Sequence, residues 1–456
     1  MYTIIASIFF LFSASDSIQL SYLYFGNTNL MGVGEISNGK KEGLWKVYFS
    51  NNPKDNPEPS LLKANPNVFE EKFTPERVVF QIQFKGDLPD GLFQENYPSG
   101  EIKSITFFKD GKQNGDFREF HKNGEIKAQG AYLNGKKEGA WEEFYENGNT
   151  GLAVNYQNGL MQGIAKGYFL DGKPQWEIPY QNGKIDGEYR LFFANGNLQE
   201  RGIYEEGIPQ GPMEKFNEEG KLIVRGNFLN GKPDGKWVSF NKSGDLVFEG
   251  EFKQGIASGQ WKEQVEILPG FYRKGQLQEG VKEGEWMLTN EFGETVQVET
   301  YKSGKLISVG PFRVAEKELD GGKLRNGTGQ RIFYDSEGHI LAKGKYSKGI
   351  QKGDWYFYFP KSNRVAAAGR LVGSDRTGMW YFYSFEGKII DQQEYFPDYS
   401  DPNSSGSGLH SSKQQRNLRT MGYPTSPNGS IDALRSAQES MFRTQFNNNG
   451  SFLLRN

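Results

Sequence analysis

Residues 134–148, which read NGKKEGAWEEFYENG, decide the fold of this chain. They consist of two glycine turns with an aromatic-rich segment between them. Asn-Gly between apolar runs is a strong hairpin signal, because both residues adopt positive φ at little cost. Variants of this stretch recur along most of the sequence, so both the fold and the function have to be argued from the recurrence.

The recurrence has a fixed period. Gly284 comes one residue late, and Gly329, Gly353 and Gly378 resume the pattern after an irregular stretch. A constant period of about 20–50 residues indicates a repeat architecture. We interpret residues 67–73 as a worn repeat unit. The regular glycines follow one another every 24 residues and are Gly91, Gly115, Gly139, Gly163, Gly187, Gly211, Gly235 and Gly259.

Each unit repeats one pattern of aromatic residues. The second residue after the glycine is usually aromatic, as at Trp141, Trp237, Trp355 and Trp380, and the fifth residue after it is mostly aromatic too. The segment that follows the turn alternates apolar and polar residues, which is typical of a strand with one buried face. This second segment also carries a recurring glycine, which we expect to leave room for a neighbouring ring. These glycines are Gly130, Gly202, Gly226 and Gly250.

The second and fifth positions have opposite parity, so a regular strand would place their rings on opposite faces of the sheet. Either a β-bulge realigns them, or both faces carry aromatic residues, as residues 355–359 (WYFYF) favour. With one hairpin per unit, the pattern predicts an all-β protein. We expect an elongated antiparallel β-hairpin array with a 24-residue period, forming a curved or twisted single-sheet rod.

The composition agrees with thin β-structure. The chain of 456 residues contains 58 glycines, and aromatic residues make up 14% of it although only 36% is hydrophobic. The net charge of −2 is well mixed, so it predicts no nucleic-acid partner and no strong membrane-binding signal. The absence of cysteine excludes disulfides and thiol chemistry.

Several segments lie outside the regular repeats. Residues 1–15 are predicted to be a signal peptide, because an apolar run at 3–12 precedes small residues. The alternative is a buried first strand. The repeat domain is assigned to residues 16–396, with a Pro/Asn-rich loop at 50–66 and an irregular repeat at 294–326, which we interpret as a distorted unit.

The C-terminal part has a different composition. Residues 397–429 are rich in Ser, Asn, Gly and Pro and are predicted to be a disordered linker. In the tail, residues 430–456, Ile431, Leu434 and Met441 fall on one face of a short predicted helix that would dock on a partner. The alternative is a frayed tail.

The pattern NGKxxGxWxxFYxNGxLxxxGxY, seen with variations at 134–156 and 230–252, resembles the MORN-repeat superfamily. It is most similar to the bacterial MORN-variant repeat that many genomes label a YwqK-type antitoxin. The resemblance covers about residues 34–395. It implies β-hairpin scaffolds for protein contact, sometimes with membrane association or dimerisation.

The sequence predicts no catalytic residue, no metal site and no cofactor. His121, His339 and His410 are far apart in sequence and are expected to be turn residues in contact with solvent. Glu142 and Glu143 could suggest the paired acids of glycoside hydrolysis. They recur with the repeat, however, and are better interpreted as one solvated strand face.

Three functional hypotheses follow. The main one is a non-enzymatic scaffold for protein–protein interaction in an exported assembly, periplasmic or associated with the outer membrane; the alternative location is the cytoplasm. The second is a carbohydrate-binding or cell-wall-binding protein that uses exposed rings. It requires Trp141, Trp237 and Trp355 to be exposed. The third is an antitoxin-like component of a toxin–antitoxin pair.

Overall fold

A computed structural model describes residues 19–24, 30–49, 78–268 and 270–396. These residues form two compact units. Unit 1 contains residues up to Leu198 together with Tyr204–Gly207, and unit 2 contains Gln199–Ile203 and the residues from Ile208 onward. The predicted signal peptide, the loop at 50–66, the linker at 397–429 and the tail with Ile431, Leu434 and Met441 lie outside the described residues.

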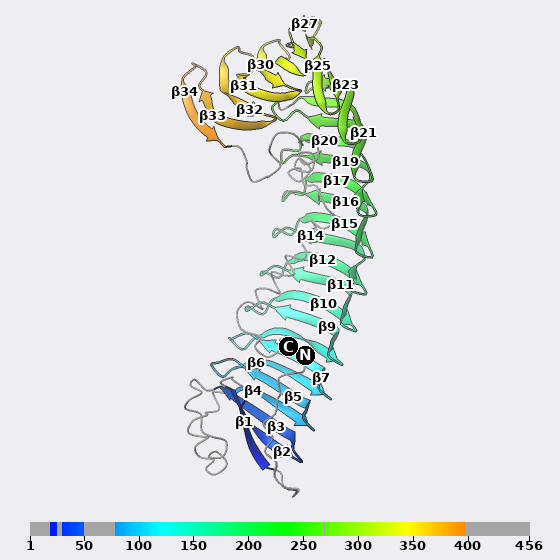
Figure 1. Ribbon diagram of the computed structural model, residues 1–456, viewed down its shortest axis with the longest axis vertical. Coiled ribbons are helices and arrows are strands. Elements are labelled where there is room, and N and C mark those ends of the chain that lie inside the picture. The colour runs from blue at the N-terminus through cyan, green and yellow to red at the C-terminus, as the bar shows by residue number, and fades with distance from the viewer. Residues whose placement is uncertain (1–18, 25–29, 50–77, 269, 397–456) are drawn as a thin grey trace. The chain divides into compact units, whose positions relative to one another are not determined.

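Unit 1 is an antiparallel meander in which each strand pairs with its neighbours in the chain (Figure 1). Strands β13 and β14 both pair with β12. The boundary between the units falls within β15 (Leu198–Glu205). The strands of unit 1 are β1 (Gln19–Tyr24), β2 (Leu30–Ser37), β3 (Lys40–Phe49), β4 (Val78–Lys85), β5 (Leu88–Asn96), β6 (Ile102–Lys109), β7 (Lys112–Phe120), β8 (Ile126–Leu133), β9 (Lys136–Phe144), β10 (Thr150–Gln157), β11 (Leu160–Tyr168), β12 (Pro174–Gln181), β13 (Lys184–Ile185) and β14 (Gly187–Phe192).

Unit 2 continues the same pattern of hairpins and then changes sheet. Its first strands are β16 (Ile208–Phe216), β17 (Leu222–Leu229), β18 (Lys232–Pro233), β19 (Gly235–Phe240), β20 (Leu246–Lys253), β21 (Ile256–Gln264), β22 (Tyr272–Gln278), β23 (Val281–Thr289), β24 (Thr295–Lys302) and β25 (Lys305–Val309). A separate hairpin of β26 (Phe312–Val314) and β27 (Lys317–Leu319) follows. The second sheet consists of β28 (Leu324–Arg325), β29 (Thr328–Tyr334), β30 (Ile340–Ser347), β31 (Ile350–Tyr358), β32 (Val365–Val372), β33 (Asp375–Tyr383) and β34 (Ile389–Tyr395).

The structure confirms the predicted fold class, an all-β array of antiparallel hairpins. In the hairpin of β9 and β10, for example, Trp141 pairs with Val154, and Gly139 pairs with Tyr156. The part of the chain that the structure describes contains no helix long and apolar enough to cross a membrane.

Residues 67–73, which the sequence indicates as a worn repeat unit, lie outside the described residues. Gly43 in β3 pairs with Phe84 in β4, as Gly139 pairs with Tyr156 in the regular hairpin. Because β3 and β4 pair directly, the sheet has no place for a unit between them. Strands β3 and β4 therefore pair as neighbours although residues 50–77 separate them in the sequence.

The irregular stretch predicted at 294–326 is where one sheet ends and the next begins. Strand β24 still pairs regularly with β23. Strand β25 is short, the β26–β27 hairpin belongs to neither large sheet, and β28 starts the second sheet. The irregularity is therefore narrower than predicted, and it is a change of sheet and not only a distorted repeat.

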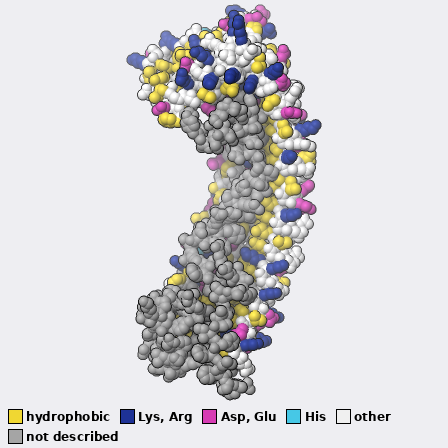
Figure 2. Space-filling view, viewed as in Figure 1, with side chains coloured by type: hydrophobic (Ala, Val, Ile, Leu, Met, Phe, Trp, Pro, Cys, Tyr) yellow, Lys and Arg dark blue, Asp and Glu magenta, His cyan; other side chains and the backbone are white. Residues whose placement is uncertain are grey.

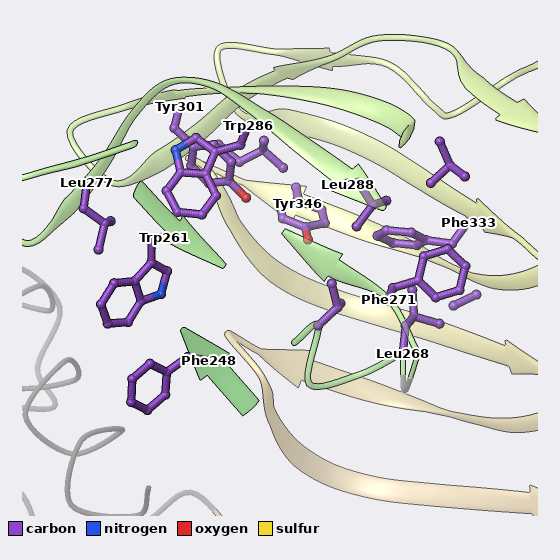
Figure 3. Packing of buried hydrophobic residues seen from close by; sticks show 14 of the residues in the cluster. Phe248, Trp261, Leu268, Phe271, Leu277, Trp286, Leu288, Tyr301, Phe333 and Tyr346 are labelled. Carbon is purple, nitrogen blue, oxygen red and sulfur yellow. The ribbon is translucent and has the colours of Figure 1, made fainter. Parts of the chain in front are cut away.

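The core of unit 2 is a continuous cluster of rings and aliphatic side chains that includes this change of sheet. Phe333 of β29 lies near Leu268 and Phe271, which belong to the connection between β21 and β22 (Figure 3). On the described surface, Lys and Arg side chains are interspersed with Asp and Glu (Figure 2). This agrees with the well-mixed charge of the sequence.

Candidate functional site

The Asn-Gly turns form one edge of each sheet. Asn134 and Gly135 have φ values of 52° and 81°, and two successive positive values are those of a type I′ turn. The Gly135 amide donates at 2.7 Å to the carbonyl of Gln113, which lies in β7 just after the preceding turn. The Gly159 amide repeats this bond one period later, to the Lys137 carbonyl at 2.9 Å. Adjacent turns are thus hydrogen-bonded to each other.

A second hydrogen bond joins adjacent turns, and the sequence analysis missed it. The Asn158 amide donates to Oε2 of Glu138 at 2.7 Å, and Glu138 directly precedes the motif glycine. The missed signal is an acceptor side chain recurring at that position. The same bond is made by Asp90, Asn114, Gln162, Gln210, Asp234, Glu283 and Thr328, each to the amide 20 residues later.

The motif glycine starts a bulge that brings the ring into the core. Gln129 pairs with Glu142 and Ala131 with Glu138, so residues 139–141 together oppose Gly130. A Cβ atom on Gly130 would lie 2.3 Å from the indole of Trp141. The strand position is therefore glycine because a side chain there would clash with the ring that packs on it. The predicted role is found again at Gly226 under Trp237 and at Gly250 under Trp261.

The same packing holds the indole in place. Nε1 of Trp141 donates to the Ala131 carbonyl at 3.1 Å. Tyr132 and Tyr156, from the strands on either side, meet the indole edge-on with centroids 5.1 Å and 6.2 Å away. We call the side of each sheet that carries Trp141 and its repeat equivalents the ring face, and the opposite side the open face.

One unit satisfies the same packing rule with other residues. Val154 stands where other strands have the glycine, and the residue at the ring position is Ala165. Both are buried. In that unit the ring comes from the next strand instead, since Trp176 packs on Gly167. A large residue at one position is thus matched by a small one at its partner.

A buried charge cluster stands where the sheet changes. Glu299 in β24 pairs with Trp286, so it occupies the position that is glycine in most units. Arg331, two residues after Gly329, occupies a ring position. Both side chains are completely buried, and Nη2 of Arg331 donates to Oε1 of Glu299 at 2.7 Å. An ion pair replaces the usual contact between a ring and a glycine.

Neighbouring groups complete the cluster. Nε of Arg273 donates to Oε2 of Glu299 at 2.9 Å, and the Tyr301 hydroxyl donates to the same oxygen at 2.6 Å. Gln297 accepts from Nη2 of Arg331 at 2.5 Å. Since Arg273 lies in β22 and Arg331 in β29, the Glu299 carboxylate joins the first sheet of unit 2 to the second.

The cluster has strongly shifted ionisation. Burial alone would raise the pKa of the Glu299 carboxyl, but the Arg273 and Arg331 guanidinium groups outweigh it and hold this pKa well below its usual range. Burial, and then the charge of Glu299, raise the pKa of the Tyr301 hydroxyl well above its usual range. At neutral pH the carboxylate is therefore charged and the phenol is neutral.

The open face carries a regular row of side chains. In unit 1, Glu142, Ala153, Lys166, Glu177 and Arg190 lie in direct register across five successive strands. Oε1 of Glu177 lies 3.1 Å from Nζ of Lys166, and its Oε2 lies 4.0 Å from Nη1 of Arg190. This row presents alternating charges to solvent.

The residues predicted from the sequence take structural positions. All eight regular motif glycines have positive φ, between 69° and 117°. Trp141, Trp237, Trp355 and Trp380 are at most 4% exposed. The ring series that the carbohydrate hypothesis needs is therefore buried, which counts against that hypothesis.

The described histidines and the paired glutamates that the sequence singles out lie in turns and on strands. Nε2 of His121 lies 2.8 Å from the Phe144 carbonyl, and His339 lies next to Asp335 in a turn. His410 lies outside the described residues. Glu142 accepts a hydrogen bond from Gln129 at 2.8 Å. Among the residues described, no group of three His, Asp or Glu could hold a metal ion.

Comparison with protein families identifies a repeat family. The family described as "MORN repeat variant" matches residues 89–110, 113–134, 137–158 and 185–206. The third of these segments covers strands β9 and β10. The chain therefore contains MORN-variant repeats, while the match does not distinguish a YwqK-type subclass. No curated protein is detectably similar to the chain in sequence.

The chain also matches chains of solved structures. They include a GtfA/B complex bound to UDP and GlcNAc, at 9% identity and a TM-score of 0.13, covering 25% of this chain and 22% of that chain. TcdB2-TccC3-TEV matches at 10% identity and a TM-score of 0.15, covering 83% and 21%. The Tc holotoxin pore of Photorhabdus luminescens matches at 9% and 0.12, covering 80% and 20%. The chain thus spans about a fifth of their length, and such low TM-scores carry no argument.

Proposed function

This chain is built from MORN-variant repeats, and from that premise we propose that it is a non-enzymatic scaffold whose open face binds a protein partner. The observation that carries the proposal is that the two faces of the sheet carry different kinds of side chain. The rings pack within the array, while the opposite face keeps half-exposed side chains of both charges in register, as in the row from Glu142 to Arg190.

A rigid face of this kind suits protein recognition. Strands joined by two hydrogen bonds per turn hold their side chains at fixed positions, so little conformational entropy is lost when a partner binds. Mixed charges in fixed order favour a complementary protein surface and disfavour others. Repeat arrays commonly present such extended surfaces to partners.

A photo-crosslinking experiment tests the proposal. A benzophenone amino acid is placed at Lys166 on the open face or at Lys137, which lies over the Trp141 ring on the ring face. We expect irradiation of the native cell fraction to give a discrete protein adduct from position 166 and none from 137. If neither position gave an adduct, or both gave the same one, the open face would not be the binding surface.

The proposal includes an exported location, periplasmic or associated with the outer membrane, because of the apolar run at 3–12. The mass of the chain recovered from its native cell fraction tests this. Loss of residues 1–15 supports export, and an intact N-terminus in the cytoplasmic fraction would contradict it. The antitoxin hypothesis stays a prediction, since it concerns a toxin encoded beside this chain.

A further inference from the structure

The open face changes character in the second sheet of unit 2. The sequence Trp-Tyr-Phe-Tyr occurs twice, at 355–358 in β31 and at 380–383 in β33. Trp355, Phe357 and Trp380 belong to the ring face, where Phe357 lies 6.1 Å from Trp355 and 5.8 Å from Trp380 between centroids. Because side chains alternate along a strand, Tyr356 and Tyr381 belong to the open face.

These two tyrosines flank an alanine. Tyr356 pairs directly with Ala368 in β32, and Ala368 pairs directly with Tyr381. The three residues occupy the same row as Glu142, Ala153 and Lys166 in unit 1. Where unit 1 has charges on both sides of an alanine, this sheet has two rings, and Tyr356 is 40% exposed.

The spacing defines what fits between the rings. Adjacent strands are about 4.8 Å apart, so residues two strands apart have Cα atoms about 9.6 Å apart. A group bound between the two rings makes one van der Waals contact of about 3.5–4.0 Å with each ring. This leaves about 2 Å for the thickness of that group, measured between its outermost atom centres. That thickness suits a puckered saturated ring, such as a proline pyrrolidine, better than a flat aromatic ring.

The floor of the slot selects between saturated rings. It is made by Ala368, whose methyl group offers no hydrogen bond. A sugar would bring hydroxyl groups onto this surface without partners, which costs free energy, whereas pyrrolidine has none. Tyrosine hydroxyls at the rims of such grooves can bond the carbonyls of a proline-rich chain, which is a recurring recognition mode.

The surrounding charge selects the sequence around the proline. Nζ of Lys343, from the neighbouring strand β30, lies 5.8 Å from the Tyr356 centroid and 5.5 Å from the Tyr358 centroid. Lys345 follows on the same strand and is exposed. In contrast, Arg370 already has Asp354 at 3.3 Å. The side of the slot next to β30 is therefore basic and complements an acidic peptide.

We propose that Tyr356, Ala368 and Tyr381 form a slot for an acidic, proline-containing peptide segment of a partner protein, with Lys343 pairing with its carboxylates. The inference rests on the proposed scaffold function and specifies one site of contact. The peptide runs along β32 with a pyrrolidine ring between the two tyrosines.

Peptide binding by the full-length chain tests the proposal. The probe is a fluorescein-labelled peptide of alternating Glu and Pro residues, followed by fluorescence anisotropy. We expect saturable binding, weakened at least ten-fold by Ala368→Leu, which fills the slot. Ala153→Leu makes the same change at the equivalent position of unit 1 and should leave affinity within two-fold. Lys343→Gln should weaken binding and flatten its salt dependence.

Other outcomes overturn the proposal. These are no binding by the wild-type chain, equal loss of affinity in both leucine variants, or equal binding of a peptide with Ala in place of Pro. Binding of chitohexaose lost on Ala368→Leu would assign the slot to sugars and would also overturn it. A failed peptide test together with a protein adduct from position 166 would leave the scaffold function standing and remove only this site.

Discussion

Replacing Glu299 by Gln removes the negative charge from the buried cluster and nearly nothing else. The carboxylate accepts bonds from Arg331, Arg273 and Tyr301. Without it, the completely buried Arg331 has no carboxylate within the cluster. Breaking a buried ion pair by removing one partner costs about 3–5 kcal/mol. We expect unit 2 to lose that much free energy of unfolding.

The measurement is thermal unfolding of the full-length chain, combined with hydrogen exchange of peptides from β24 and β29. For a unit of this size, the loss corresponds to a lower midpoint by about 6–20 °C. Exchange should accelerate in both strands together, because the carboxylate joins them. The control is Glu318→Gln, whose partner Arg313 is well exposed. It should cost about 0.5 kcal/mol or less.

The pH dependence gives an independent test of the same cluster. Because the pKa of Glu299 is depressed in the folded state, its stabilisation is fully present above the unfolded pKa of about 4.3. It is lost as the pH falls toward the folded pKa. The wild-type chain should therefore lose stability below about pH 4.3 more steeply than Glu299→Gln does.

A double-mutant cycle completes the test. Arg331→Met removes the buried cation and keeps an apolar side chain of similar length. The double variant with Glu299→Gln should be less destabilised than the sum of the two single variants, by at least about 1 kcal/mol. An effect of Glu299→Gln within about 0.5 kcal/mol of zero, or strict additivity, would refute the view that this pair holds the two sheets together.

Three further predictions concern unit 1, each measured by urea unfolding. Gly130→Ala places a methyl group against the indole of Trp141 and should cost about 1–3 kcal/mol; a neutral result would contradict the ring-on-glycine packing. Trp141→Phe loses the bond to the Ala131 carbonyl and should cost about 1–3 kcal/mol, and equal stability would show that the bond contributes nothing. Glu138→Ala should cost about 0.5–1.5 kcal/mol and expose the Asn158 amide to exchange, which should stay protected in Glu138→Gln.

Much of this fold is predictable because it rests on local chemistry. The turn at Asn134 and Gly135 needs only residues that accept positive φ. A ring lies 11 positions after a glycine in several units, as Trp141 does after Gly130, so the sequence shows both. An acceptor side chain such as Glu138 likewise recurs before most motif glycines, so the bond that it accepts leaves a signal in the sequence.

The parts that were not predicted depend on pairing between distant strands. The direct pairing of β3 with β4 cannot be read from a period, because Gly43 and Gly91 lie two full periods apart in the sequence while β3, β4 and β5 pair in succession. The Glu299–Arg331 pair joins residues from two sheets, and neither residue type signals the other in sequence. Only the loss of the repeat pattern near residue 310 indicated that the regular array of hairpins is interrupted there.

The exceptions can be compared with one packing pattern. In many units a large ring faces a glycine, as Trp141 faces Gly130, although Ile82 faces Phe93 without one. Val154 and Ala165 replace the glycine and the ring by two side chains of more similar size. The ring of that unit then comes from Trp176.

Glu299 and Arg331 are a second exception, at the positions of the glycine and the ring. Two large side chains are accommodated because Arg331 comes from another sheet, and their charges cancel where neither could be buried alone. A ring on a glycine can be formed with any neighbouring unit of the same pattern, since every unit offers the same two surfaces. A buried carboxylate accepts only a strand that brings a cation to that position. The exchange of glycine and ring for glutamate and arginine therefore specifies which strand covers β24 at a point where β25, the next strand along the chain, is short.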